Sequence, residues 1–199
     1  MEDLMMDMMN GDEKAEYLLD RVFDVNNIRM KYLAKAGCDI IWIGDDIGMQ
    51  RTTMMSVDMW ETWLKPRIRK IIASGKSINP EMLILYHSDG YIIPFLEGLI
   101  EVGIDILNPV QPESMQFKEI HRLTGDRLSY WGTIGTQTTL PFGTPDDVKK
   151  EVNTNLEICG NKGGIVIAPT HIVEPEVPWE NIEALVEAAA NFRGTANYR

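Results

Sequence analysis

Cysteine is scarce in this sequence, and its scarcity bears on the compartment in which the protein works. Only two of the 199 residues are cysteines, Cys38 and Cys159. They lie far apart, at what we interpret as a helix–strand junction and a helix end, which is typical of reduced proteins and excludes a disulfide framework. Single cysteines are more often small buried hydrophobes than metal ligands. We therefore expect free thiols and a cytoplasmic protein.

Long apolar runs and clusters of basic residues are also missing. No segment reaches the roughly 20 uninterrupted apolar residues that a membrane span needs. Residues 1–10 carry Glu2, Asp3 and Asp7 and lack the basic start of a signal peptide. The net charge is −11, and no run of Lys or Arg residues forms a basic stripe. Nucleic acid and anionic membranes would therefore be repelled at long range. We expect no nucleic-acid partner and no membrane segment.

The sequence is instead rich in apolar residues, which occur in regularly alternating segments. Hydrophobic residues make up 44% of the chain, enough for a substantial core, and we expect one domain over residues 1–199. Short apolar runs of strand length alternate with stretches of helical periodicity. The predicted strands are 38–44, 82–87, 105–109, 128–134 and 164–169; the predicted helices are 18–37, 58–74, 94–102, 117–123, 145–158 and 179–192.

Apolar strands that alternate with helices predict a parallel sheet covered by helices. A doubly wound sheet and a (β/α)8 barrel both fit this pattern. No Gly-x-Gly-x-x-Gly motif follows any predicted strand, so the dinucleotide-binding form of the doubly wound fold lacks its fingerprint. A complete barrel has eight strands and typically about 250 residues. We therefore predict an α/β fold of the (β/α)8 barrel type, truncated on its N-terminal side, with about five parallel strands and six helices.

Polar side chains gather where the predicted strands end. In a barrel these carboxyl ends and the loops after them form the active face. We interpret the amide and hydroxyl groups there as substrate-binding and the acidic and imidazole groups as catalytic or metal-binding. The substrate-binding set is Asn108, Gln111, Thr133 and Gln137; the acidic and imidazole set is Asp45, Asp46, His87, Asp89, His171 and Glu174; Thr170 also lies at a strand end.

Two of the three histidines lie at such strand ends, and each has carboxylates close by in the sequence. His87, Asp89, His171 and Glu174, with an aspartate from the 45–46 pair in reserve, make a plausible N/O ligand set for a divalent metal. The same residues could transfer protons without a metal, since histidine titrates near neutral pH.

Each of these residues also has a purely structural interpretation. Asp45 and Asp46 could simply cap their loop, because aspartate favours turns. His87 could be a core histidine satisfied by a carbonyl. The third histidine, His121, lies in a predicted helix beside Arg122 and is expected on the surface.

The stretch from Ala36 to Phe192 resembles the uroporphyrinogen decarboxylase family, which also contains cobalamin-linked methyltransferases. The resemblance rests on motifs that occur in the same order along the chain, at 44–48, 87–90, 101–112, 130–134, 168–171 and 177–182. It implies a (β/α)8 barrel. Residues 1–10 resemble a helix that lies inside the barrel sequence of full-length relatives, so the resemblance also implies that the early aspartate and the arginine-rich loop of the decarboxylases precede this chain.

The resemblance implies two possible activities. In the decarboxylases, lyases of porphyrin biosynthesis, His171 matches the active-site histidine, whereas the position of Asp45 carries a serine. In the methyltransferases, zinc on a His-x-Cys pair and a later Cys activates a thiol. Here His87 matches the first ligand, Asp89 replaces the first Cys and His171 replaces the last.

Three functions follow as hypotheses. The first is a metal-dependent, methyltransferase-like enzyme in which His171, Asp45 and Asp46 have catalytic roles. Its substrate would be a corrinoid-linked or other tetrapyrrole compound, either free or carried by a corrinoid protein. The second is a uroporphyrinogen decarboxylase, which requires no cofactor. The third is a non-catalytic fragment that assembles through its open sheet, with itself or with another chain, because unpaired strand edges promote association.

Overall fold

The fold alternates strands and helices along the whole described chain. The computed structural model describes residues 1–159 and 163–192, so the end of the expected single domain, 193–199, lies outside it. The strands are β1 (Ile40–Gly44), β2 (Leu83–His87), β3 (Ile106–Asn108), β4 (Ser129–Trp131) and β5 (Ile165–Val166). The α-helices are α1 (Glu2–Asn10), α2 (Glu13–Lys35), α3 (Val57–Trp63), α4 (Lys65–Lys76), α5 (Leu96–Val102), α6 (Phe117–Thr124), α7 (Thr139–Phe142), α8 (Pro145–Cys159) and α9 (Trp179–Asn191).

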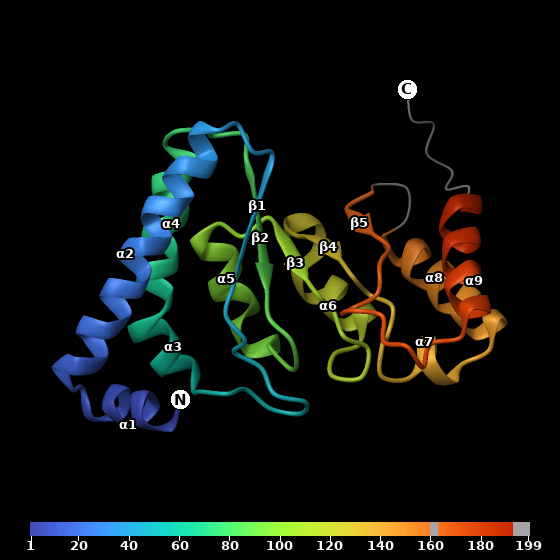
Figure 1. The fold of residues 1–199 in the computed structure, drawn as a ribbon, viewed down its shortest axis with the longest axis horizontal. Coiled ribbons are helices and arrows are strands. Elements are labelled where there is room, and N and C mark those ends of the chain that lie inside the picture. Colours follow the sequence, from blue (N-terminus) through green and yellow to red (C-terminus); the bar gives the residue numbers. More distant parts are fainter. Residues whose placement is uncertain (160–162, 193–199) are drawn as a thin grey trace.

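The five strands form one parallel sheet in chain order, β1-β2-β3-β4-β5. Figure 1 shows the strands side by side, with α2 and α4 beyond the β1 end and α8 and α9 beyond the β5 end. Within the described residues, β1 and β5 each pair with a single strand, so the sheet is open at both edges. The predicted fold class is confirmed: this is part of a (β/α)8 barrel with five parallel strands.

The register divides the strand residues between two faces, because successive side chains point to opposite sides of a sheet. One face packs into the main core beneath the helices and contains Ile41, Ile84, Tyr86, Leu107 and Tyr130. The opposite face, the inner face of the barrel, keeps apolar groups in solvent. Its exposed members are Ile40, Trp42, Leu83 and Val166.

Local sequence explains where the helices begin. Thr144 caps α8: its hydroxyl accepts a hydrogen bond from Asp147 N at 3.3 Å, and the Asp147 carboxylate accepts one from Thr144 N at 2.9 Å. Pro145 then occupies the first helical position, as the sequence predicts. The helix predicted over 58–74 is in fact two, α3 and α4, divided at Leu64. Pro66 has no N–H to donate to the preceding turn, which accounts for the break.

The remaining differences from the predicted elements concern short segments. The structure has nine α-helices among the described residues. Besides dividing α3 from α4, it adds α7 to the six helices predicted from periodicity, and α1 agrees with the helix that the family resemblance implies for residues 1–10. Two 3-10 turns, η1 (Ile93–Phe95) and η2 (Gly125–Arg127), precede α5 and β4. A smaller apolar cluster of Ile134, Leu140, Val148, Val152, Val177, Ala184 and Ala188 joins α7, α8 and α9. Of the described helices, none is long and apolar enough to cross a membrane.

Candidate metal centre

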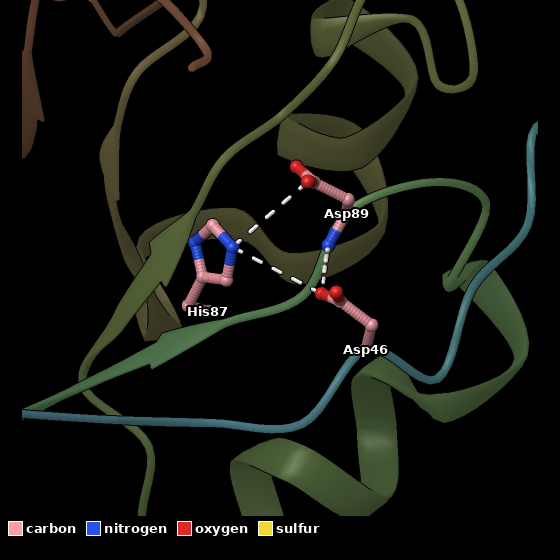
Figure 2. Close-up of side chains that lie close together, drawn as sticks. All are labelled: Asp46, His87 and Asp89. Carbon is pink, nitrogen blue, oxygen red and sulfur yellow. Dashed lines mark hydrogen bonds and ion pairs between the residues drawn. The ribbon is translucent and has the colours of Figure 1, made fainter. Parts of the chain in front are cut away.

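An imidazole and two carboxylates converge at the carboxyl ends of β1 and β2. His87 Nε2 lies 3.9 Å from Asp46 Oδ1 and 4.0 Å from Asp89 Oδ2. One ligand atom from each of the three residues lies within 4.8 Å of the others. Figure 2 shows the three side chains pointing toward a common point, Asp46 from the loop after β1 and Asp89 from the turn after β2. We call these residues the Asp46–His87–Asp89 triad.

Contacts between two loops bring the carboxylates together. Asp46 Oδ1 accepts a hydrogen bond from Asp89 N at 3.0 Å, and the buried Ser88 Oγ accepts one from Ile47 N at 3.1 Å. Glycine lets the loops approach this closely. A Cβ at Gly48 would lie 2.5 Å from the Asp89 carbonyl oxygen. Gly90 has a φ of +81°, a conformation that L side chains rarely adopt.

The imidazole of His87 is held from two sides. Its Nδ1 lies 2.7 Å from Asn108 Oδ1, and Asn108 Nδ2 donates to the carbonyl of Trp131 at 2.7 Å. The ring of Trp42, at the corresponding face of β1, lies 5.4 Å from the imidazole at an interplanar angle of 35°. These contacts direct Nε2 toward the carboxylates.

Two carboxyl groups near the triad histidine, those of Asp89 and Asp45, lie where losing a proton is costly. Burial, together with the Asp46 charge, raises the pKa of Asp89, while His87 and His171 oppose this shift. Burial and the neighbouring Asp46 charge raise the pKa of the Asp45 carboxyl to about 6. Carboxyl groups in this setting gain from a bound cation, because a positive charge favours their ionised forms.

The donor set fits a divalent cation. Asp89 Oδ1 is buried and has no hydrogen-bond partner, which is costly for a carboxylate oxygen unless another group satisfies it. Zinc bonds of about 2.0–2.2 Å place tetrahedral ligand atoms roughly 3.3 Å apart, so the two distances from His87 Nε2 would have to shorten by about 0.6–0.7 Å. One imidazole nitrogen and two carboxylates make a harder site than one built on thiolates.

A pocket of about 400 Å³ opens beside the triad and shares Asp89 with it. Several residues predicted for the site from the sequence line this pocket: Gln111, Gln137, His171 and Glu174. His171 is exposed and lies within electrostatic reach of Asp89. His171 and Glu174 therefore line a pocket that Asp89 also lines, whereas Asp46, and neither of these two, joins His87 and Asp89 in the three-residue cluster.

Three other residues of the expected site, Thr133, Thr170 and Asp45, do not line this pocket. Thr133 is 1% exposed, and its hydroxyl accepts a hydrogen bond from Asn155 Nδ2 at 3.1 Å. Thr170 is also buried, and its hydroxyl meets that of Thr136 at 3.1 Å. Asp45 lines a separate pocket of about 310 Å³ between α2 and β1.

Three contributors were not found by reasoning from the sequence. Trp42 stacks on His87, and the signal for it was an aromatic residue two positions before a strand end. Ser88 joins the two loops, although it was read only as part of a polar turn. Glu113 accepts hydrogen bonds from Gln137 N and from Thr138 Oγ1, and so fixes the loop that carries Gln137. No sequence pattern signalled this last contact.

Comparisons with known proteins agree with this architecture. Methylcobamide:CoM methyltransferase MtaA of Methanosarcina barkeri is 32% identical over 161 residues, 80% of this chain and 44% of that protein. Uroporphyrinogen decarboxylase of Coxiella burnetii is 23% identical over 158 residues, 79% of this chain and 42% of that protein. A solved methyltransferase from Methanosarcina mazei superposes with a TM-score of 0.77 at 26% identity, covering 96% of this chain and 53% of that one.

The chain thus spans about half the length of the relatives it matches. The family model for uroporphyrinogen decarboxylase (URO-D) matches residues 1–192, nearly all of the sequence. The resemblance first found in the strand-end motifs is therefore confirmed, and this chain belongs to the uroporphyrinogen decarboxylase family.

Proposed function

We propose that the Asp46–His87–Asp89 triad binds a divalent cation, with zinc as the first candidate. We propose further that the complete barrel transfers a methyl group from a corrinoid to an acceptor molecule in the adjoining pocket. The observation that carries this proposal is the convergence of one imidazole and two carboxylates. Asp89 faces His87 Nε2 through Oδ2, and its other oxygen, Oδ1, is buried without a hydrogen-bond partner. The methylcobamide:CoM methyltransferases among the relatives support the reaction class. The corrinoid would be a small-molecule substrate or a group carried by a partner protein.

The residues divide the work as follows. Bound zinc would supply Lewis acidity, which would lower the pKa of a coordinated thiol so that the thiol ionises near neutral pH. His87 and the two aspartates would hold the cation, and Asp89 also lines the pocket. His171 faces the same pocket and can give or take a proton there. Gln111, Gln137 and Glu174 would hold the substrate through hydrogen bonds.

Porphyrin decarboxylation is less well supported by the pocket. Decarboxylation needs a cationic or hydrogen-bonding environment for the charge that develops on the pyrrole, and its substrate is a polycarboxylate. The described residues that line the pocket include Asp89, Glu174 and Glu176 and no Lys or Arg. Such a lining repels carboxylate groups, which favours the methyltransferase-like reaction.

Zinc titration of the purified chain against a chromogenic chelator tests the proposal. We expect wild-type chain to compete for zinc, and His87→Ala to lose this competition. His121→Ala is the matched control, because His121 packs against Phe117 and Tyr130 away from the triad. Equal zinc affinity of the two variants would rule the triad out. In a complete barrel, His171→Ala should keep the metal and lose turnover.

A second candidate function, assembly through the open sheet, is favoured by the exposed inner face. Ile40, Trp42, Leu83 and Val166 keep between 41% and 59% of their surface in solvent although they lie on strands. An eight-stranded barrel would cover them. Sedimentation over a range of concentrations should show association of this chain, with itself or with the complementary part of a barrel. A chain that stays monomeric at all concentrations and does not bind the complementary part of a barrel would refute the idea. Either activity is proposed for the cytoplasm, in keeping with the free thiols of Cys38 and Cys159.

A further inference from the structure

We propose that Asn108 is a positioning residue that fixes the tautomer of His87, with the ring proton on Nδ1 and the lone pair of Nε2 directed at the cation. The inference rests on the proposed cation site at the triad. The side chain of Asn108 bonds to His87 and to Trp131 and to neither carboxylate, so it acts through the imidazole. It lies on β3 opposite His87 in the parallel register and is 5% exposed.

The orientation of the Asn108 amide follows from its partners. Asn108 Nδ2 lies 2.7 Å from the carbonyl oxygen of Trp131, and a carbonyl oxygen only accepts hydrogen bonds. The NH₂ group must therefore face Trp131, and Oδ1 must face His87. Had the amide been turned over, two acceptor oxygens would meet at hydrogen-bond distance, inside the protein and away from water.

The orientation of the amide in turn decides the histidine proton. Asn108 Oδ1 lies 2.7 Å from His87 Nδ1, and because the oxygen can only accept, Nδ1 carries the hydrogen. In the neutral ring Nε2 then has a free lone pair. It faces Asp46 Oδ1 and Asp89 Oδ2 at 3.9 and 4.0 Å, distances too long for hydrogen bonds. A lone pair between two carboxylates is repelled by both, and either a cation among them or a proton on Nε2 relieves this repulsion.

Backbone and side-chain hydrogen bonds hold Asn108 in place. Its backbone oxygen accepts a hydrogen bond from Ser88 N at 3.0 Å, and its side chain reaches β4, so this one residue links β2, β3 and β4. The stacked ring of Trp42 limits rotation of the imidazole on the other side. Histidines that bind metals typically donate their second N–H to such a partner, and losing the partner typically costs 10–100-fold in metal affinity.

Nitrogen NMR of the metal-free protein tests this directly, because the chain has only three histidines to label with ¹⁵N. At alkaline pH, long-range ¹H–¹⁵N correlations should show His87 as the Nδ1–H tautomer. Asn108→Leu, which removes the acceptor, should shift the ring toward Nε2–H and weaken zinc binding by about 10–100-fold. Asn108→Asp, which keeps an acceptor oxygen, should restore the Nδ1–H tautomer.

Asn155→Leu is the matched control, since Asn155 is another buried amide, on α8, that donates hydrogen bonds to Thr133 and has none to His87. It should lower stability and leave the His87 tautomer and zinc affinity unchanged. A wild-type ring in the Nε2–H form would overturn the inference, even where the leucine variant does not fold. Zinc binding unaffected by Asn108→Leu would overturn the role of Asn108 and leave the cation site standing. An Nδ1–H ring without zinc binding would refute the cation site and leave the tautomer standing.

Discussion

Replacing Gly48 by alanine should separate the two loops that carry the triad aspartates. The added Cβ would lie 2.5 Å from the Asp89 carbonyl oxygen and 2.8 Å from Tyr91 N, both backbone atoms that cannot rotate away. Ordinary contact begins near 3.4 Å, so the loops would have to part by about 0.9 Å. Crowding of this kind typically costs about 1–3 kcal/mol of unfolding free energy.

The displacement acts on the site as well as on stability. Asp46 Oδ1 accepts a hydrogen bond from Asp89 N between these same two loops. Moving the loops apart would therefore weaken that bond and lengthen the distances within the triad. We expect zinc affinity to fall at least tenfold, in line with losses seen when support around a metal ligand is removed. Urea unfolding followed by tryptophan fluorescence gives the first quantity, and competition with a zinc chelator gives the second.

Gly98→Ala is the matched control for this prediction. Its Cβ would also meet an atom at 2.5 Å, but that atom is Cζ3 of the buried Trp60 in the helix layer. This variant should lose stability and keep zinc affinity. The reasoning is refuted if Gly48→Ala unfolds at the wild-type urea concentration, or if the two variants bind zinc equally well.

Two further predictions concern stability. Leu107→Ala should lower the unfolding free energy by about 2–5 kcal/mol, because Leu107 is fully buried in the main core; Leu123→Ala, at a 39% exposed position, should cost far less, and equal urea midpoints would contradict the burial argument. Burial, with the Glu113 charge adding to it, raises the pKa of Glu151. Ionising this carboxyl therefore costs free energy in the folded protein, and the folded state loses stability as the pH rises above about 4.5, the pKa of a glutamate in the unfolded chain. Glu151→Gln, which can still accept from Gly135 N, should make stability less dependent on pH between 4 and 7 and higher at pH 7; an unchanged pH profile of thermal unfolding would count against it.

The alternation of strands and helices could be predicted from the sequence because parallel strands are buried on both faces. Continuous apolar runs such as 82–87 therefore stand out against the helical periodicity around them. Strand ends were placed less well: β3 and β4 end at Asn108 and Trp131, earlier than predicted. The four-residue helix α7 was missed because so short a segment has no measurable period.

The site was only partly predictable, for a physical reason. His87 and Asp89 are two residues apart in one turn, so local sequence brings them together. Which further carboxylate approaches them depends on the path of the loop after β1, and contacts to Ser88 and Asp89 fix that path. Those contacts join residues 41 and 43 positions apart, a pairing that a single sequence does not reveal.

The most direct test of the account is the metal content of the purified, folded chain, measured by elemental mass spectrometry. We predict close to one zinc or other divalent ion per wild-type chain, and its loss from an Asp46→Asn, Asp89→Asn double variant that still folds. The His121→Ala variant should retain the metal. A wild-type chain that stays free of metal after dialysis against zinc, or a double variant that binds as much as wild type, would contradict the proposed metal centre.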